Sequence, residues 1–223
     1  MLVPRNLLEA TGLRRGLPMI FVHTPKCGGM YVAQAIGNRR ERHCITRRHP
    51  TMQGHKTYVE FRDALAALNI NIDDFVTFGL VRNPWSWHVS FFHYVRGLTG
   101  RNKSKHESLV EKMNSISFPD YVASFDNPDP KKRIDIASAR QVHEWVTDES
   151  GNIAVDDVLR METLRTDLEA LRDKYSLRMN IPDQNINTSK HDDYRKYYSD
   201  REIEIIADRH RRDIELFSYT FDK

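Results

Sequence analysis

Cysteine is scarce in this sequence, and long apolar runs are missing from it. Two cysteines among 223 residues, Cys27 and Cys44, are too few for a disulfide framework, which favours a reducing, cytoplasmic location. No run of about 18 apolar residues occurs, so we expect no membrane span. Residues 1–19 have neither a long apolar core nor a small-residue cleavage site, and we therefore expect no signal peptide.

Two common binding signatures are also missing. In a G-x-x-x-x-G-K-[ST] loop the lysine follows the glycines, whereas Lys26 precedes them here and Cys27 follows it, which argues against a P-loop nucleotide kinase. The sequence has no C-x-x-C or H-x-x-x-H pair either. Four metal-ligand side chains lie near one another in the chain, among arginines that would repel a dication: His43, Cys44, His49 and His55. We therefore expect no metal site.

The composition is that of a folded protein, with 39% hydrophobic and 29% charged residues. A net charge of +3 is too small to indicate a nucleic-acid partner. The basic residues are clustered, however, and the densest cluster comprises Arg39, Arg40, Arg42, Arg47 and Arg48. Such clusters are usually solvated faces. This one lies between the two motifs described below, and we expect it to face an anionic acceptor.

Apolar runs alternate with helical periodicities along the chain. Buried strands are predicted at residues 19–23, 75–81 and 154–160, with a candidate further strand at 42–47. Helices are predicted to begin at residues 31, 57, 84, 136, 162 and 199. This alternation predicts an α/β fold in three layers, with a central, mostly parallel sheet flanked by helices.

The whole chain, residues 1–223, is expected to form a single domain. Residues 99–135 are polar and contain three prolines. They are predicted to be an insertion near the acceptor site, with one short helix at residues 118–125.

The first motif, P-K-C-G-G-M-Y at residues 25–31, follows the first predicted strand. Ligands of parallel sheets bind beyond this end of the strands. Gly28 and Gly29 let the backbone approach a ligand closely, and the first amides of the next helix favour an anion. Lys26 adds a mobile positive charge. The alternative is an ordinary strand-to-helix turn with a surface lysine.

The second motif comprises Arg82, at the end of the next strong strand, and Ser90 in the helix after it. A guanidinium can bind a phosphate through two hydrogen bonds, and a serine hydroxyl can add one more. The alternatives are a salt bridge for Arg82 and a bond to its own helix backbone for Ser90. Taken together, the motifs indicate a ligand with an anionic group at each end.

This pair of motifs resembles the sulfotransferases that use 3′-phosphoadenosine 5′-phosphosulfate (PAPS). It is most similar to the branch that contains carbohydrate sulfotransferases, including the heparan sulfate 2-O-sulfotransferases, and many bacterial relatives. Further segments resemble that branch in the same order and spacing, so that the resemblance spans most of residues 19–221: residues 54–61, 158–164, 185–189 and 213–219. The resemblance implies a P-loop-like fold.

The resemblance also implies how the ligand is held and what is done with it. The first motif would hold the 5′-phosphosulfate through Pro25, Lys26, Cys27, Gly28, Gly29, Met30 and Tyr31. Arg82 and Ser90 would bind the 3′-phosphate, with Asn187 and Ser189 near the nucleotide. The expected reaction moves the sulfuryl group to a hydroxyl or amine of an acceptor, expected to be a carbohydrate, and needs no metal. The chain departs from the family at Trp87, where members often carry an arginine.

The catalytic roles follow from the same resemblance. It assigns the general base to His55, and an imidazole titrates near neutral pH. Other branches use a glutamate, so Glu60 is the alternative base. Lys26 and the loop amides would stabilise the developing negative charge. A non-catalytic relative that binds PAPS, its product PAP (3′-phosphoadenosine 5′-phosphate) or another polyanion stays open.

Several other side chains are expected to be structural. His23, His88 and His93 are interpreted as packing or capping groups. Trp85 and Trp87 either belong to the core or stack on the adenine. The sequence does not fix the acceptor, the regiochemistry or the oligomeric state.

Overall fold

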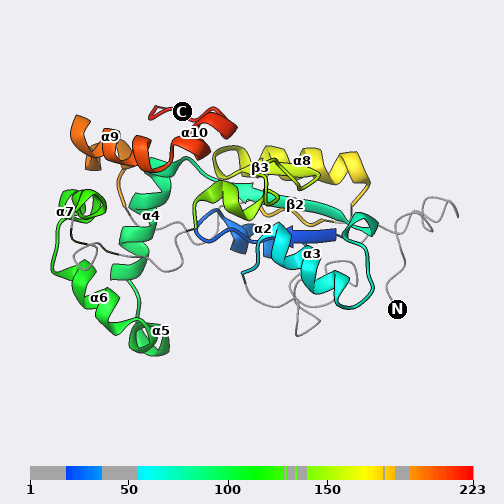
Figure 1. Cartoon of the computed structure of the whole chain (residues 1–223), viewed down its shortest axis with the longest axis horizontal. Coiled ribbons are helices and arrows are strands. Elements are labelled where there is room, and N and C mark those ends of the chain that lie inside the picture. Colours follow the sequence, from blue (N-terminus) through cyan, green and yellow to red (C-terminus); the bar gives the residue numbers. More distant parts are fainter. Residues whose placement is uncertain are drawn as a thin grey trace, which may run out of the picture. The chain divides into compact units, whose positions relative to one another are not determined.

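The computed structural model describes residues 19–36, 55–127, 129, 134, 140–177, 179–183 and 191–222. They form two compact units. The first unit comprises Met1–Arg82 and Val142–Asn187, and the second comprises Asn83–Gln141 and Thr188–Lys223. Figure 1 labels their helices and strands.

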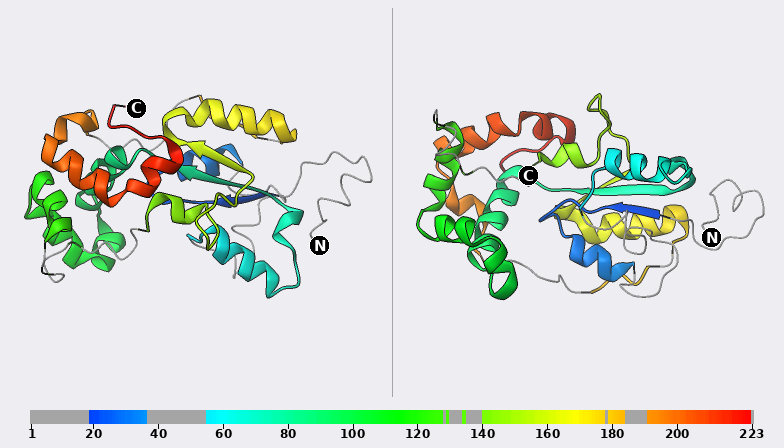
Figure 2. Two further views of the ribbon diagram at one scale, coloured as in Figure 1. Left: turned by 45° about the horizontal axis from the view of Figure 1, so that its top comes forward. Right: turned by 60° about the horizontal axis from the view of Figure 1, so that its bottom comes forward.

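A three-stranded parallel sheet forms the centre of the first unit. Its strands are β1 (Met19–Val22), β2 (Val76–Val81) and β3 (Asp157–Arg160), in the order β1-β2-β3. Helices α2 (Gly29–Ala35) and α8 (Leu164–Tyr175) cover one face, and α3 (Tyr58–Ala66) covers the other, as both views of Figure 2 show. Because both faces are covered, β1 and β2 are buried at every position, which explains their unbroken apolar sequences.

The predicted α/β fold, a parallel sheet between helices, is therefore confirmed. The described part of the first unit also contains the short 3-10 helices η3 (Ile72–Asp74), η6 (Val142–Trp145) and η7 (Met161–Thr163). The candidate strand at residues 42–47 lies outside the described residues. So does part of the helix predicted from residue 136, and residues 142–145 are the 3-10 helix η6.

The described part of the second unit is helical. It contains α4 (Pro84–Arg96), α5 (Gly100–Lys105), α6 (Glu107–Asn114), α7 (Phe118–Ala123), η4 (Ser124–Asp126), η8 (Tyr194–Tyr197), α9 (Asp200–Arg209) and α10 (Arg211–Phe217). The helix predicted to begin at Pro84 is confirmed, with Asn83 as its N-cap. The final predicted helix is divided into α9 and α10 at His210.

Residues 99–135 contain more helix than the sequence suggested. The helix predicted near Phe118 is present, but α5 and α6 were not predicted. They bury few side chains: none in α5, and only Val110 and Met113 in α6. Two apolar positions are too few to produce a recognisable helical period.

Both tryptophans of the second motif belong to the core of the second unit. Trp85 is 3% exposed, and its indole N–H donates to the carbonyl oxygen of Ile203 at 3.1 Å. Trp87 is 6% exposed and stacks on Phe91, with 5.1 Å between ring centroids. The core interpretation is therefore confirmed for both, and the adenine-stacking alternative is not supported.

Four buried polar side chains form a continuous chain of hydrogen bonds in the second unit. Tyr121 Oη lies 2.8 Å from His88 Nδ1, and His88 Nε2 lies 2.8 Å from His210 Nε2. His210 Nδ1 lies 2.7 Å from Asp213 Oδ2. An ionised Asp213 only accepts, so His210 donates from Nδ1, and in its neutral form it accepts at Nε2. His88 then donates from Nε2 and accepts from Tyr121. Burial lowers the pKa of His88 well below its usual value, which agrees with this neutral form.

Removing one member of this chain is expected to destabilise the protein strongly. In His210→Ala, Asp213 stays fully buried and loses its histidine partner, and His88 loses its acceptor. We expect the free energy of unfolding to fall by about 3–5 kcal/mol. Urea denaturation, followed by the fluorescence of the buried tryptophans, measures this loss. His106→Ala removes an exposed histidine of the same unit and should stay within about 0.5 kcal/mol. An equally small change in His210→Ala would contradict the prediction.

Candidate functional site

The loop between β1 and α2 has a backbone that requires glycine at its end. Lys26 and Gly28 both adopt left-handed conformations, with φ of 62° and 83°. A Cβ atom on Gly28 would lie 2.5 Å from Met161 Sδ and 2.7 Å from Leu164 Cδ2, so a side chain there would displace both and would also strain the left-handed backbone. Met161 and Leu164 follow β3. The loop is therefore held against the carboxyl edge of the sheet, where ligands of parallel sheets bind.

Gly29 is in close contact with His23, the residue that follows β1. A Cβ atom on Gly29 would lie 1.9 Å from His23 Nε2. The sequence indicated that His23 closes the strand end against the loop, and this contact confirms it. Gly29 is needed here for close packing rather than for its backbone angles, because its φ is not in the left-handed region.

Two cationic side chains meet at this loop. Arg82, after β2, donates from its guanidinium to the backbone oxygen of Lys26 at 2.8 Å. Burial, followed by the charge of Arg82, lowers the pKa of Lys26 to about 8. A bound anion would counter both effects, because it favours the charged lysine. The sequence placed both cations at the ligand but did not predict the bond between Arg82 and the loop backbone.

The other residues of the first motif are mostly structural in their contacts. Cys27 is fully buried, and its thiol lies 3.5 Å from the carbonyl oxygen of Pro25. The Tyr31 hydroxyl donates to the carbonyl oxygen of Pro182 at 2.5 Å and so anchors α2. Met30 is 46% exposed. Thr24, which precedes the motif, has a buried hydroxyl oxygen that finds no hydrogen-bond partner among the described residues, so the loop has a polar group to spare for a ligand.

His55 lies at the same edge of the sheet, next to His23. Its Nδ1 is 2.9 Å from the backbone oxygen of His23, and the two rings have centroids 4.5 Å apart. Its ring also meets the edge of Trp145, at 6.2 Å. A carbonyl oxygen only accepts, so Nδ1 carries the proton and Nε2 has the lone pair. His55 is exposed, which leaves it accessible to an acceptor. The sequence did not predict the contacts with His23 and Trp145.

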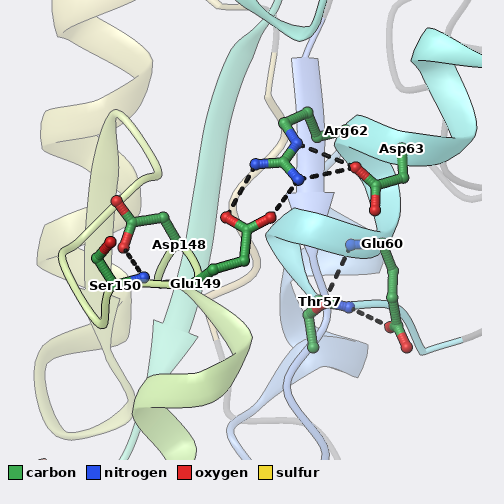
Figure 3. A network of polar contacts seen from close by, with 7 residues as sticks. All are labelled: Thr57, Glu60, Arg62, Asp63, Asp148, Glu149 and Ser150. Atoms are coloured by element: carbon green, nitrogen blue, oxygen red, sulfur yellow. Dashed lines mark hydrogen bonds and ion pairs between the residues drawn. The ribbon is translucent and has the colours of Figure 1, made fainter.

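Glu60, the alternative base, is part of the cap of α3. Its carboxylate accepts from the backbone N–H of Thr57 at 2.8 Å, and the Thr57 hydroxyl accepts from the backbone N–H of Glu60 at 3.2 Å (Figure 3). This is a capping box, which stabilises the start of the helix. The T-x-x-E pattern that produces it can be read from the sequence.

An ion pair connects α3 with the turn after η6 (Figure 3). Arg62 donates from both terminal guanidinium nitrogens to Glu149, and it also bonds Asp63. The Arg62 hydrogen bond holds the pKa of Glu149 down to about 2, so the pair is ionised at neutral pH. The pair links the middle of α3 to the turn that follows η6, the 3-10 helix that ends in Trp145.

The remaining predicted residues divide into two groups. Ser90 belongs to the second unit, where it is 1% exposed within α4. Asn187, Ser189 and the arginine cluster of residues 39–48 lie outside the described residues, as do His43, Cys44 and His49. Within the described ranges, no group of three or more His, Cys, Asp or Glu side chains is arranged to hold a metal ion.

Comparison with known families identifies the class of protein. A profile described as "Sulfotransferase family" matches residues 15–220. The chain belongs to this sulfotransferase family. The match covers nearly the whole chain, agrees with the P-loop-like α/β fold, and supports sulfuryl transfer as the general reaction. Comparison with curated proteins returned no match. In the part of the chain that the structure describes, no helix is both long and apolar enough to cross a bilayer.

Proposed function

We propose that this sulfotransferase moves the sulfuryl group from PAPS to a hydroxyl or amine of an acceptor, with a carbohydrate as the expected acceptor and His55 as the general base. One observation carries the proposal. The first unit brings a glycine loop with two cations and a histidine of fixed tautomer to the same edge of a parallel sheet. That combination suits a reaction in which one group loses a proton while another gains negative charge.

The residues present fit PAPS. Residues 25–31 would hold its 5′-phosphosulfate, with Lys26 as the main cation and the orphaned Thr24 hydroxyl at hand. Arg82 would brace the loop through the Lys26 carbonyl and bind the 3′-phosphate together with Ser90. Asn187 and Ser189 are proposed nucleotide contacts from the resemblance alone. PAPS supplies an activated sulfuryl group, and the resemblance implies that no metal is needed.

In the proposed reaction, the protein's own groups handle one proton and one developing charge. His55 Nε2 accepts the proton of the acceptor hydroxyl as the new oxygen–sulfur bond forms. The His23 carbonyl, at 2.9 Å from Nδ1, stabilises the resulting imidazolium. The bond from sulfur to the bridging phosphate oxygen breaks, and its electron pair stays on the phosphate. Lys26 and the loop amides stabilise that charge.

The identity of the base can be tested through Glu60. Glu60→Gln removes the carboxylate but keeps a side chain that can complete a capping box. If His55 is the base, kcat should stay within about twofold of the wild type. Steady-state sulfuryl transfer measures kcat, and thermal unfolding checks that the helix cap is intact. A loss of kcat of two orders of magnitude or more in a folded variant would make Glu60 the base.

The pKa of Lys26 predicts how nucleotide binding depends on pH. Lysine is charged below its pKa, so the affinity for PAP should be greatest below about pH 8 and should fall above it. We expect Kd to rise about fivefold from pH 8 to pH 9, with proton uptake on binding near pH 8. The phosphates of PAP are already ionised there, because their second pKa is about 6. Calorimetry in buffers of different ionisation enthalpy measures both quantities, and a flat Kd over this range would contradict the prediction.

Several finer points belong to the same proposal. The two compact units are proposed to act as a single sulfotransferase domain, because the family profile spans both. Residues 99–135 and the arginine cluster at residues 39–48 are the proposed sources of acceptor specificity. A cytoplasmic location stays a prediction, as does the branch of heparan sulfate 2-O-sulfotransferases and bacterial relatives.

Two measurements test the proposed function. PAP should bind tightly in a calorimetric titration, whereas ATP with Mg²⁺ should not. PAPS labelled with ³⁵S should then transfer label to at least one member of a panel of neutral, acidic and sulfated glycans. If the protein binds PAP but neither transfers label to any acceptor nor hydrolyses PAPS, the result would favour the non-catalytic relative. No PAP binding would overturn the proposal.

A further inference from the structure

His23 contacts His55 and lies against Gly29 of the anion loop, although the reaction described above uses only its backbone. It follows β1 directly, and its ring stacks on Phe21 with 5.4 Å between centroids and 17° between planes. Phe21 stacks in turn on Phe78 of β2. The ring of His23 therefore rests on a rigid part of the sheet, so its position is fixed by packing.

The backbone oxygen of His23 selects the tautomer of His55. Neutral histidine in water prefers to carry its proton on Nε2. In this structure the proton is on Nδ1, because that nitrogen faces the His23 carbonyl at 2.9 Å. The bond therefore places the lone pair of His55 on Nε2, the nitrogen that does not face His23. A free histidine would have this arrangement only part of the time.

The ring of His23 lies between His55 and the anion loop. Its centroid is 4.5 Å from that of His55, and its Nε2 would lie 1.9 Å from a Cβ on Gly29. One planar side chain thus touches both the base and the first residue of α2. Misplacing a reacting group by about 1 Å can cost about 100-fold in rate. The ring of His23 would therefore control the distance between His55 and the anion loop.

We infer that His23 is a positioning residue for sulfuryl transfer: its carbonyl sets the tautomer of His55, and its ring sets the separation between His55 and the anion loop. The inference rests on the proposed function, in which His55 is the base. It adds that the base is held against the anion loop by a protein side chain, the ring of His23. It also gives Gly29 a second purpose, which is to leave room for His23.

Three single variants and one double variant test this role. In His23→Ala, the ring of His55 loses its support, so we expect kcat to fall at least tenfold while the Kd for PAP changes less than about twofold. His23→Asn is the milder variant, which keeps a polar side chain but loses the part that reaches Gly29. Gly29→Ala inserts a methyl group into the space of His23, and it should lower kcat in the wild-type background. In the His23→Ala background that space is open, so the double variant should have the same kcat as His23→Ala alone.

The tautomer of His55 provides a readout that needs no activity. In protein with ¹⁵N-labelled histidine, imidazole correlation spectra distinguish Nδ1–H from Nε2–H, and a His55→Gln sample assigns the signals. Wild-type His55 should be an Nδ1–H tautomer, with or without PAP. His23→Ala and His23→Asn keep the backbone carbonyl of residue 23 but remove the ring that supports His55. The His55 imidazole should then leave that carbonyl part of the time, so part of the population should move to the Nε2–H tautomer. Glu204→Gln, at an exposed position of α9 in the second unit, should change neither kcat nor the His55 signals.

The outcomes separate this inference from the proposed function. An unchanged tautomer together with unchanged kcat in folded His23 variants would overturn the positioning role. A parallel tenfold loss of PAP affinity with an unchanged tautomer would also overturn it, because His23 would then be a nucleotide contact. If wild-type protein neither binds PAP nor transfers sulfate, the proposed function fails, and the tautomer spectra alone decide whether His23 orients His55.

Discussion

Lys26→Met is expected to remove tight binding of PAP and to lower kcat for sulfuryl transfer by about 10²–10³-fold. Methionine keeps the length and much of the apolar stem of the lysine, so the variant removes the charge with little change in packing. The loop then keeps the nearby Arg82, which is already bonded to the backbone oxygen of residue 26. A flexible lysine contributes a point charge that a braced guanidinium cannot replace.

Calorimetric titration with PAP and steady-state transfer from PAPS measure the two effects. Lys174→Met is the matched control, since Lys174 also belongs to the first unit but is 53% exposed and pairs with Asp157. We expect it to bind PAP like the wild type. If Lys26→Met binds PAP normally, the loop does not hold the anionic end of the nucleotide, and the site must be sought elsewhere.

His55→Ala is expected to reduce kcat by about 10²–10⁴-fold while leaving the Kd for PAP unchanged. The loss falls on kcat because the imidazole acts on the acceptor's proton, which moves only in the transition state. His55 is exposed and is not part of the buried core, so the fold should tolerate the change. Kinetics with saturating PAPS, together with PAP titration, separates the two quantities.

His55 precedes α3 and Glu60 lies in its first turn, so the two candidate bases are close in the sequence. The comparison with Glu60→Gln therefore shows which of the two acts as the base. Loss of turnover in His55→Ala with normal turnover in Glu60→Gln identifies the base. A His55→Ala variant that retains wild-type kcat would exclude His55. If that variant instead loses PAP affinity in proportion to kcat, His55 is a binding residue rather than a base.

The strands and the anion loop of the first unit were predictable because they have strong local signals. The apolar runs of β1 and β2 and the glycines at residues 28 and 29 are readable in the sequence and lie where expected. In the second unit, Pro84 after Asn83 marks the start of α4 in the same way. The sequence placed Lys26 and Arg82 after the carboxyl ends of two parallel strands, at opposite ends of one ligand. It did not predict the hydrogen bond from Arg82 to the backbone oxygen of Lys26. Local sequence patterns were therefore sufficient for the strands and for the glycine loop.

Other features could not be predicted because they depend on contacts between distant residues. Nothing local in the sequence indicates that the ring of His23 packs on His55, or that Trp145 meets the same imidazole. The helices α5 and α6 were missed because they bury too few side chains to leave a pattern. Roles for Ser90, Asn187 and Ser189 continue to depend on the family resemblance.

The hydrogen-bonded chain from Tyr121 to Asp213 limits how the sequence of this protein can evolve. Each of its four members has the next as a partner, so a single substitution leaves a polar group stranded inside the second unit. Replacing all four by apolar groups of similar volume could be tolerated, but every intermediate on that route is damaged. The four positions are therefore expected to be inherited together, and a laboratory evolution experiment should exchange them as a set or leave them untouched.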